Sequence, residues 1–244
     1  MQLSTDTVIC FDVSGSMEAK DFTPNRLEAA KSVVIDFIEK MESNRMAIVL
    51  FSGFAFTQSP LTFDTEILKN LLRDVKIGMV RISGTAIGSA LGVALNRFKS
   101  KDISKQKVIV LLTDGENNRG LSPMKYAEMA KKAGVKIYTI GMGTPEGYSF
   151  SQRGPFGRTY SQKTTLNEEL LRKIAKMTGG KYYYGSNENE LKKAYREIAE
   201  LEKKKVKTIK KRVFYPRYRL ITLILLIFLI FEVFVIWRKE FIYL

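Results

Sequence analysis

Short, mostly apolar runs recur along the chain and predict the strands of a sheet. They are rich in β-branched and aromatic residues, and runs of this length without polar alternation are typical of strands buried on both faces. The runs lie at 7–11, 46–51, 108–112, 135–140 and 181–184. A further stretch, 55–58, lies between Gly53 and Pro60 and predicts a short edge strand paired to the second run.

Between these runs, apolar residues return at helical spacing and predict amphipathic helices. The expected helices cover about 26–42, 63–72, 84–98, 124–133 and 166–177, and a closing helix is marked by Leu191, Tyr195, Ile198 and Leu201. Alternating strands and helices predict an α/β fold with a doubly wound, mostly parallel sheet flanked by helices. Residues 143–163 form a long polar insertion dotted with aromatic residues, for which no strand is predicted.

The composition removes several kinds of chemistry. The chain has no His and a single Cys, Cys10. Ser-His-Asp and Cys-His triads, imidazole zinc sites, Cys clusters and intrachain disulfides are therefore excluded. Cys10 lies within an apolar run, where a small buried residue is expected. Any chemistry must use oxygen ligands or carboxylates.

Oxygen-bearing side chains gather where predicted strands end. Asp12, Ser14 and Ser16 follow the first strand two residues apart, and Asp114 follows the third. Thr85 lies between two glycines at a predicted helix start. Ligands of doubly wound sheets bind at the carboxyl ends of the strands, so these residues are expected to converge. Oxygen donors of this kind suit Mg²⁺. The local alternative is that the Asp and Ser residues form a polar turn or helix cap, and that Thr85 is only a cap.

The five residues resemble the metal-ion-dependent adhesion site of von Willebrand factor type A domains. That site has the pattern D-x-S-x-S, then a Thr, then an Asp, and every position is present here in the same order. The resemblance implies that Ser14 and Ser16 ligate Mg²⁺ (or Mn²⁺) directly, and that Thr85 does so in the ligand-competent state. Asp12 and Asp114 would act through bound waters. It further implies a protein partner offering an Asp or Glu to the metal, and no catalysis.

Three segments carry a closer resemblance, to the bacterial Bat (aerotolerance) proteins. These segments are 21–31, 113–118 and 155–158. Bat proteins are membrane-anchored type A domain proteins, typically encoded beside MoxR-type AAA+ ATPases. The resemblance therefore implies a stress-tolerance or aerotolerance complex with such an ATPase and other Bat-like membrane proteins. Family members also carry one or two N-terminal membrane spans, which are not in this sequence.

The C-terminal part changes character. The net charge of the chain is +15. Nine of its Lys and Arg residues lie within 203–219, where there is no Asp or Glu. Residues 220–237 are almost wholly apolar with one charge, Glu232. Eighteen helical residues extend about 27 Å, just enough to cross a bilayer core. The alternative, a buried C-terminal helix, needs a core that the preceding domain has already filled.

We therefore expect a type A domain (1–202), a basic juxtamembrane linker (203–219), a transmembrane helix (220–237) and a short tail (238–244). The anchor would lie in the bacterial cytoplasmic membrane as a single pass. The basic linker places the domain on the cytoplasmic side by the positive-inside rule. The family arrangement with upstream spans commonly places it outside the cytoplasm, so both orientations remain open.

Two other functions compete with metal-dependent docking. One is a Mg²⁺-dependent phosphatase or phosphotransferase using Asp12 as nucleophile, although such enzymes usually carry a second carboxylate two residues on, where Ser14 stands. The other is nucleic acid binding by residues 203–219. That basic cluster adjoins the apolar segment, so anionic lipid headgroups explain it better, and no nucleic acid partner is expected.

Overall fold

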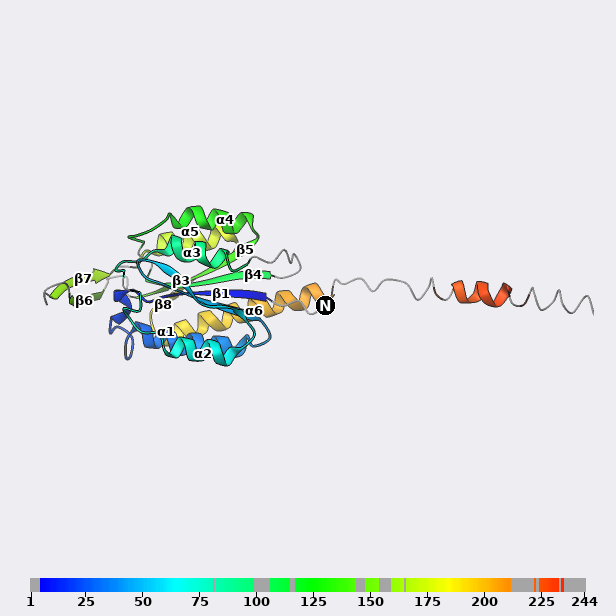
Figure 1. Cartoon of the computed structure of the whole chain (residues 1–244), viewed down its shortest axis with the longest axis horizontal. Coiled ribbons are helices and arrows are strands. Elements are labelled where there is room, and N and C mark those ends of the chain that lie inside the picture. Colours follow the sequence, from blue (N-terminus) through cyan, green and yellow to red (C-terminus); the bar gives the residue numbers. More distant parts are fainter. Residues whose placement is uncertain are drawn as a thin grey trace, which may run out of the picture. The chain divides into compact units, whose positions relative to one another are not determined.

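The computed structural model describes residues 5–80, 82–98, 106–114, 117–143, 148–153, 159–164, 166–211, 222, 224–232 and 234. The chain divides into two compact units, residues 1–206 and 207–244. The first unit holds the sheet and most of the helices (Figure 1). It contains every residue that the sequence proposes for the metal site.

A six-stranded sheet forms the centre of the first unit. Its strands run in the order β3-β2-β1-β4-β5-β8, and all neighbours are parallel except the edge pair β2 and β3. The predicted mostly parallel α/β sheet is therefore confirmed. The strands are β1 (Thr5–Asp12), β2 (Arg45–Phe51), β3 (Ala55–Thr62), β4 (Gln106–Thr113), β5 (Val135–Met142) and β8 (Tyr182–Gly185).

Helices cover both faces of this sheet. In Figure 1, α3, α4 and α5 lie above it and α1, α2 and α6 lie below it. Successive β1 residues face opposite layers: Phe11 packs into the lower apolar core and Cys10 into the upper one. The helices are α1 (Arg26–Lys40), α2 (Thr65–Arg73), α3 (Ile87–Leu95), α4 (Pro123–Lys132), α5 (Glu168–Thr178) and α6 (Glu188–Lys211).

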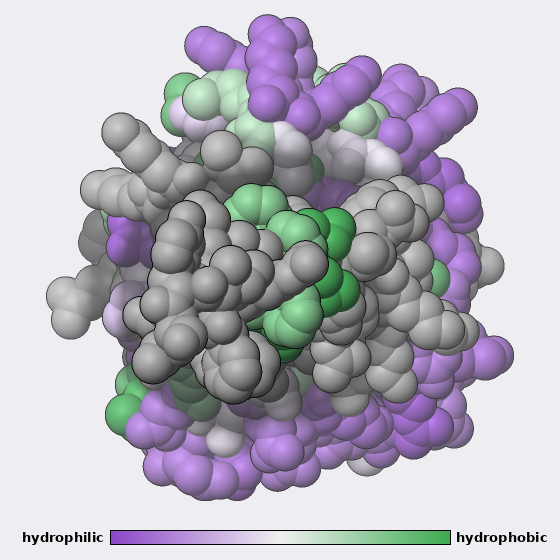
Figure 2. All heavy atoms as spheres, turned by 90° about the vertical axis from the view of Figure 1, so that its right-hand side faces the viewer, coloured by the Kyte–Doolittle hydropathy of each residue, from purple (hydrophilic) through white to green (hydrophobic). Residues whose placement is uncertain are grey.

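Side-chain caps explain where several helices begin. The Asn25, Asp64 and Asn167 side chains accept backbone N–H groups three residues further on, which fixes the first turns of α1, α2 and α5. The outer faces of the helices are polar, and hydrophilic side chains dominate the top and bottom of the molecule in Figure 2. The amphipathic pattern read from the sequence thus corresponds to one buried and one hydrated face.

Two parts of the sheet prediction need correction. The edge strand β3 extends through Pro60 to Thr62, beyond the predicted 55–58, because its pairing with β2 contains register shifts that accommodate irregular backbone. The polar insertion contains a two-stranded antiparallel hairpin, β6 (Tyr148–Arg153) and β7 (Thr159–Thr164). Its alternation of polar and aromatic residues was too weak a signal for a strand.

The second unit includes the apolar segment proposed as a membrane anchor. Residues 220, 221, 223, 233 and 235–237 of that segment lie outside the described residues. Residues 224–232 are helical and their large apolar side chains are exposed. Among the residues that the structure describes, no helix has both the length and the apolar character needed to cross a membrane.

Candidate metal centre

The loop after β1 brings three of the predicted ligands together. The Ser14 N–H donates to Asp12 Oδ1 at 2.8 Å, and the Ser14 and Ser16 hydroxyls share a hydrogen bond of 2.9 Å. An Asp side chain that accepts the N–H two residues on forms a local turn, so the D-x-S spacing itself folds the loop. A 3₁₀ turn, η1 (Gly15–Glu18), continues from it. The polar turn, which the sequence offered as the alternative to a metal site, is therefore the same turn that brings these oxygen atoms together.

The end of β4 lies beside the end of β1. The parallel register pairs Phe11 with Leu112, and the Thr113 hydroxyl donates to Asp12 Oδ2 at 2.6 Å. Asp114 follows directly and is 1% exposed. From β1 the chain continues to β2 on one side and returns to β4 on the other, so this is the topological switch point of the sheet. Position within the fold therefore explains why Asp12 and Asp114 meet.

Thr85 is held at this edge by its backbone. Its N–H donates to Asn118 Oδ1 at 2.8 Å, and its carbonyl accepts the Asn118 N–H at 3.1 Å. The next residue, Ala86, donates its N–H to the carbonyl of Ser52 at 2.7 Å. The loop that carries Thr85 is thus fixed between the loop after β2 and the loop after β4.

A buried arginine is the main feature that sequence reasoning missed. Arg26, at the start of α1, is 1% exposed and pairs through Nε and Nη2 with both oxygens of Asp21, at 2.8 and 2.6 Å. Its Nη1 lies 3.7 Å from Asp114 Oδ2. A Cβ at Gly143 would lie 2.8 Å from Arg26 Nη2, so the guanidinium needs a glycine there. Arg26 and Asp21 both lie within residues 21–31, which carry the resemblance to Bat proteins, but no local spacing indicates that Arg26 lies beside Asp114.

The electrostatics of the site favour a cation. Burial, and then the negative charge of Asp114, raise the pKa of the Asp12 carboxyl well above its usual value. All five predicted residues are buried, with exposed fractions of 9% or less for Asp12, Ser14, Ser16, Thr85 and Asp114. Two carboxylates and three hydroxyls are the donors that a hard divalent cation prefers, so the residues present fit such an ion.

In the part of the chain that the structure describes, carboxylates, imidazoles and thiols alone do not make a metal site. Within the described ranges, no group of three or more His, Cys, Asp or Glu side chains could hold a metal. The predicted donor set contains only two carboxylates, so its three hydroxyls would have to supply the other protein ligands. The assignment of the five residues as metal ligands remains a prediction.

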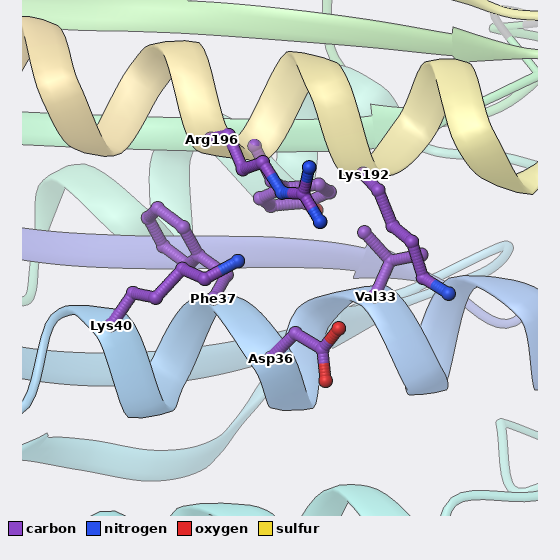
Figure 3. Close-up of a pocket in the computed structure, with 7 residues that line it drawn as sticks. Val33, Asp36, Phe37, Lys40, Lys192 and Arg196 are labelled. Carbon is purple, nitrogen blue, oxygen red and sulfur yellow. The ribbon is translucent and has the colours of Figure 1, made fainter.

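Two hollows lie elsewhere on the first unit. Figure 3 shows one between α1 and α6, where Lys40, Lys192 and Arg196 surround Asp36; it offers about 10 Å³, room for one water at most. The other is an open groove of about 300 Å³ between residues 21–23 and 187–189. Neither hollow is lined by a predicted metal ligand, so the carboxyl ends of β1 and β4 remain the candidate metal site.

Comparisons with known proteins agree with this architecture. The family model of the von Willebrand factor type A domain matches residues 6–197. The chain is similar to the crystal structure of conserved hypothetical protein BatB from Bacteroides thetaiotaomicron, with 29% identity, a TM-score of 0.74, and coverage of 84% of this chain and 100% of that one. It is also similar to an aerotolerance-related membrane protein from Bacteroides fragilis, with 30% identity, a TM-score of 0.71, and coverage of 81% and 99%.

A further similar structure bears on the metal. It is proximal thread matrix protein 1 from the mussel byssus with a zinc-occupied MIDAS motif, at 25% identity and a TM-score of 0.63, covering 82% of this chain and 46% of that one. Among curated relatives, an uncharacterized protein of Borreliella burgdorferi is 31% identical over 186 residues, 75% of this chain. The chain spans only 54% and 62% of the length of the first two curated relatives that it matches.

Proposed function

The chain belongs to the von Willebrand factor type A family and is related to the Bat aerotolerance proteins, and from this we propose that it docks a protein partner through a divalent cation. Mg²⁺ is the proposed ion, with Mn²⁺ as the alternative. Ser14, Ser16 and Thr85 would hold it directly, and Asp12 and Asp114 would hold it through waters.

Two observations support the proposal: the hydrogen bonds that gather Asp12, Ser14 and Ser16 at the switch point, and the burial of Thr85 and Asp114 on the loops beside it. Three neutral hydroxyls do not neutralise a dication, and carboxylates acting through waters do so only in part. When bound, the ion therefore supplies a Lewis-acidic position that attracts an Asp or Glu from a partner. The protein's own contribution is to fix the hydroxyls and to keep Asp12 oriented by its bonds from Ser14 and Thr113.

Metal binding is tested on the purified full chain by calorimetric titration with MgCl₂ and MnCl₂. Saturable binding is expected in the wild type and loss of binding in Asp12→Ala and Ser14→Ala. Ser43→Ala is the matched control, because Ser43 is an exposed serine in the turn between α1 and β2. It precedes the amino-terminal end of β2, whereas the candidate site lies at the carboxyl ends of the strands. Equal binding by all four proteins would overturn the assignment of the site.

The proposed role is binding and not catalysis. Both oxygens of Asp12 accept hydrogen bonds, from the Ser14 N–H and the Thr113 hydroxyl, which does not favour attack by this carboxylate on a phosphate ester. Assays with p-nitrophenyl phosphate and Mg²⁺ are expected to show no turnover above that of Asp12→Ala. Turnover that requires Asp12 would establish the phosphatase alternative.

We also propose that residues 220–237 anchor the chain in the bacterial cytoplasmic membrane, with the type A domain on the cytoplasmic side. The support is the row of large apolar side chains exposed at 224–232, where Leu226 and Leu229 are 62% and 64% exposed, and the basic linker before it. The full chain is expected in the membrane fraction after carbonate washing, and a Leu226→Lys, Leu229→Lys variant in the supernatant. Retention of this variant in the membrane fraction would contradict the anchor.

A MoxR-type AAA+ ATPase is the partner that the Bat relation suggests. The proposal is tested by co-purifying a MoxR-type ATPase of the same organism with the detergent-solubilised full chain. Retention is expected in Mg²⁺ and not in EDTA or with Ser14→Ala. Equal retention in Mg²⁺, in EDTA and with Ser14→Ala would show that the contact does not involve the candidate metal site.

A further inference from the structure

Three large apolar side chains are exposed on loops around Thr85. Phe54 follows β2 and is 54% exposed, Ile82 precedes α3 and is 45% exposed, and Leu121 precedes α4 and is 54% exposed. Isolated exposed apolar residues need no explanation, but three on adjoining loops beside a binding site do.

Backbone hydrogen bonds join the three loops into one surface. The Gly53 N–H donates to the Ile82 carbonyl at 3.0 Å, which connects the loops of Phe54 and Ile82. The Asn118 and Arg119 N–H groups both donate to the Thr85 carbonyl, at 3.1 and 3.2 Å, which connects the loops of Ile82 and Leu121. The backbone around Thr85 thus links the three loops that carry the exposed apolar side chains.

The surface is also fixed in place before any partner arrives. The Ser52 hydroxyl donates to the carbonyls of Ile82 and Gly84, at 3.2 and 2.9 Å. A Cβ at Gly88 would lie 2.0 Å from the Leu121 carbonyl oxygen, so the loop of Leu121 packs directly on the start of α3. Such a surface loses little conformational entropy on binding.

A positive charge accompanies the apolar groups. Arg119 is exposed, and a Cβ at Gly84 would lie 3.0 Å from its side-chain Cγ and Cδ. The aliphatic part of the Arg119 side chain therefore lies against the loop that carries Thr85. Together with a bound dication, this charge is complementary to an acidic ligand. A ligand that is acidic but otherwise hydrophilic would make no favourable contact with the apolar side chains.

We infer that the partner segment carries its metal-binding Asp or Glu beside a bulky aliphatic or aromatic residue, which packs against Phe54, Ile82 and Leu121. This inference rests on the proposed function and names the chemistry of its partner. A lone acidic loop would use the metal but not this surface. An acidic residue flanked by Leu or Phe would use both.

The test uses an array of nine-residue peptides with a central Asp, incubated with the full chain in MgCl₂. In the first set the two neighbours of the Asp are Leu and Phe, and in the second set both are Ser. The third set replaces the Asp by Asn. The Leu/Phe set is expected to bind about tenfold more tightly than the Ser set, a difference of about 1.4 kcal/mol. The Asn set and all sets in EDTA are expected to show no binding.

Matched variants locate the contact. Phe54→Ser and Leu121→Ser are expected to remove the tenfold preference and to keep weak, Asp-dependent binding. Phe63→Ser is the control, because Phe54 and Phe63 flank β3 at its two ends and are similarly exposed, at 54% and 56%.

The outcomes separate the inference from the proposed function. Equal binding of the Leu/Phe and Ser sets, with Asp and Mg²⁺ still required, would overturn the apolar contact and leave metal-dependent docking intact. A preference lost equally in Phe63→Ser would also overturn it. No binding above that of Asp12→Ala by any set would count against the docking function itself.

Discussion

Replacing Arg26 by Gln tests whether a buried cation holds the metal site together. The substitution keeps a polar side chain of similar length and removes the charge. It leaves Asp21 and Asp114, whose side chains are 9% and 2% exposed, without the guanidinium that lies between them. We expect a large loss of stability in the metal-free protein.

The magnitude follows from the geometry of the pair. Arg26 makes a two-pronged contact with Asp21 and lies 3.7 Å from Asp114 Oδ2, with its own side chain 1% exposed. Removing one partner of such a buried pair costs about 3–5 kcal/mol, because the remaining charge stays desolvated. In a domain of this size each kcal/mol lowers Tm by about 2–4 °C, so a decrease of roughly 6–20 °C is expected.

The assay is urea and thermal unfolding of the full chain, in EDTA and in saturating MgCl₂. Mg²⁺ should raise the Tm of Arg26→Gln by more than that of the wild type, because the ion then replaces the positive charge that the substitution removes beside Asp114. Arg26→Lys should recover part of the loss, since an ammonium keeps the charge without the fork. Arg172→Gln is the control: Arg172 is 60% exposed, pairs with Glu168 in the same helix and lies 4.3 Å from the centre of the Tyr182 ring, so its loss should cost about 1–2 kcal/mol.

Three results would refute this reasoning. One is a loss in Arg26→Gln no larger than in Arg172→Gln. The second is additivity of Arg26→Gln and Asp21→Asn within about 0.5 kcal/mol, since contacting residues should couple. The third is an equal effect of Mg²⁺ on the wild type and on Arg26→Gln.

Three further predictions concern the metal, the thiol and a buried hydrogen bond. Mg²⁺ at a hundred times its Kd should stabilise the wild type by about 2.7 kcal/mol in urea titrations, and should leave Ser14→Ala unchanged. Cys10 is fully buried and burial raises the pKa of its thiol, so it should react with Ellman's reagent at pH 8 only on unfolding; prompt reaction would contradict its position. Tyr138 donates to the buried Glu202 at 2.6 Å, so Tyr138→Phe should lower the free energy of unfolding by about 1.5–3 kcal/mol, and a value near zero would show that the bond contributes little.

The sheet and its helices could be predicted because their signals are local. Five apolar runs mark the buried strands, and the 3.6-residue spacing marks the helices that cover them. The ends were less certain, as for β3, whose continuation through Pro60 depends on its register with β2. The β6–β7 hairpin was missed because polar residues dominate both segments and no apolar run marks either strand.

The candidate ligands could be predicted for a similar reason, and the rest of the site could not. The D-x-S-x-S spacing folds its own loop through the bond from the Ser14 N–H to Asp12, so sequence and geometry carry the same information there. Arg26 meets Asp114 only because α1 starts beside the end of β4, which no local pattern reports.

The apolar loop residues make this limit more specific. Phe54, Ile82 and Leu121 are indistinguishable in the sequence from core residues, and only the packing of the loops exposes them. Metal ligands must satisfy the ion's coordination whatever the partner is, so they leave a spacing that sequence can show. A docking surface has to match only its own partner, so it leaves no such pattern. A candidate metal site can therefore be predicted from its motif, whereas a docking surface consists of side chains that the sequence presents as ordinary hydrophobic residues.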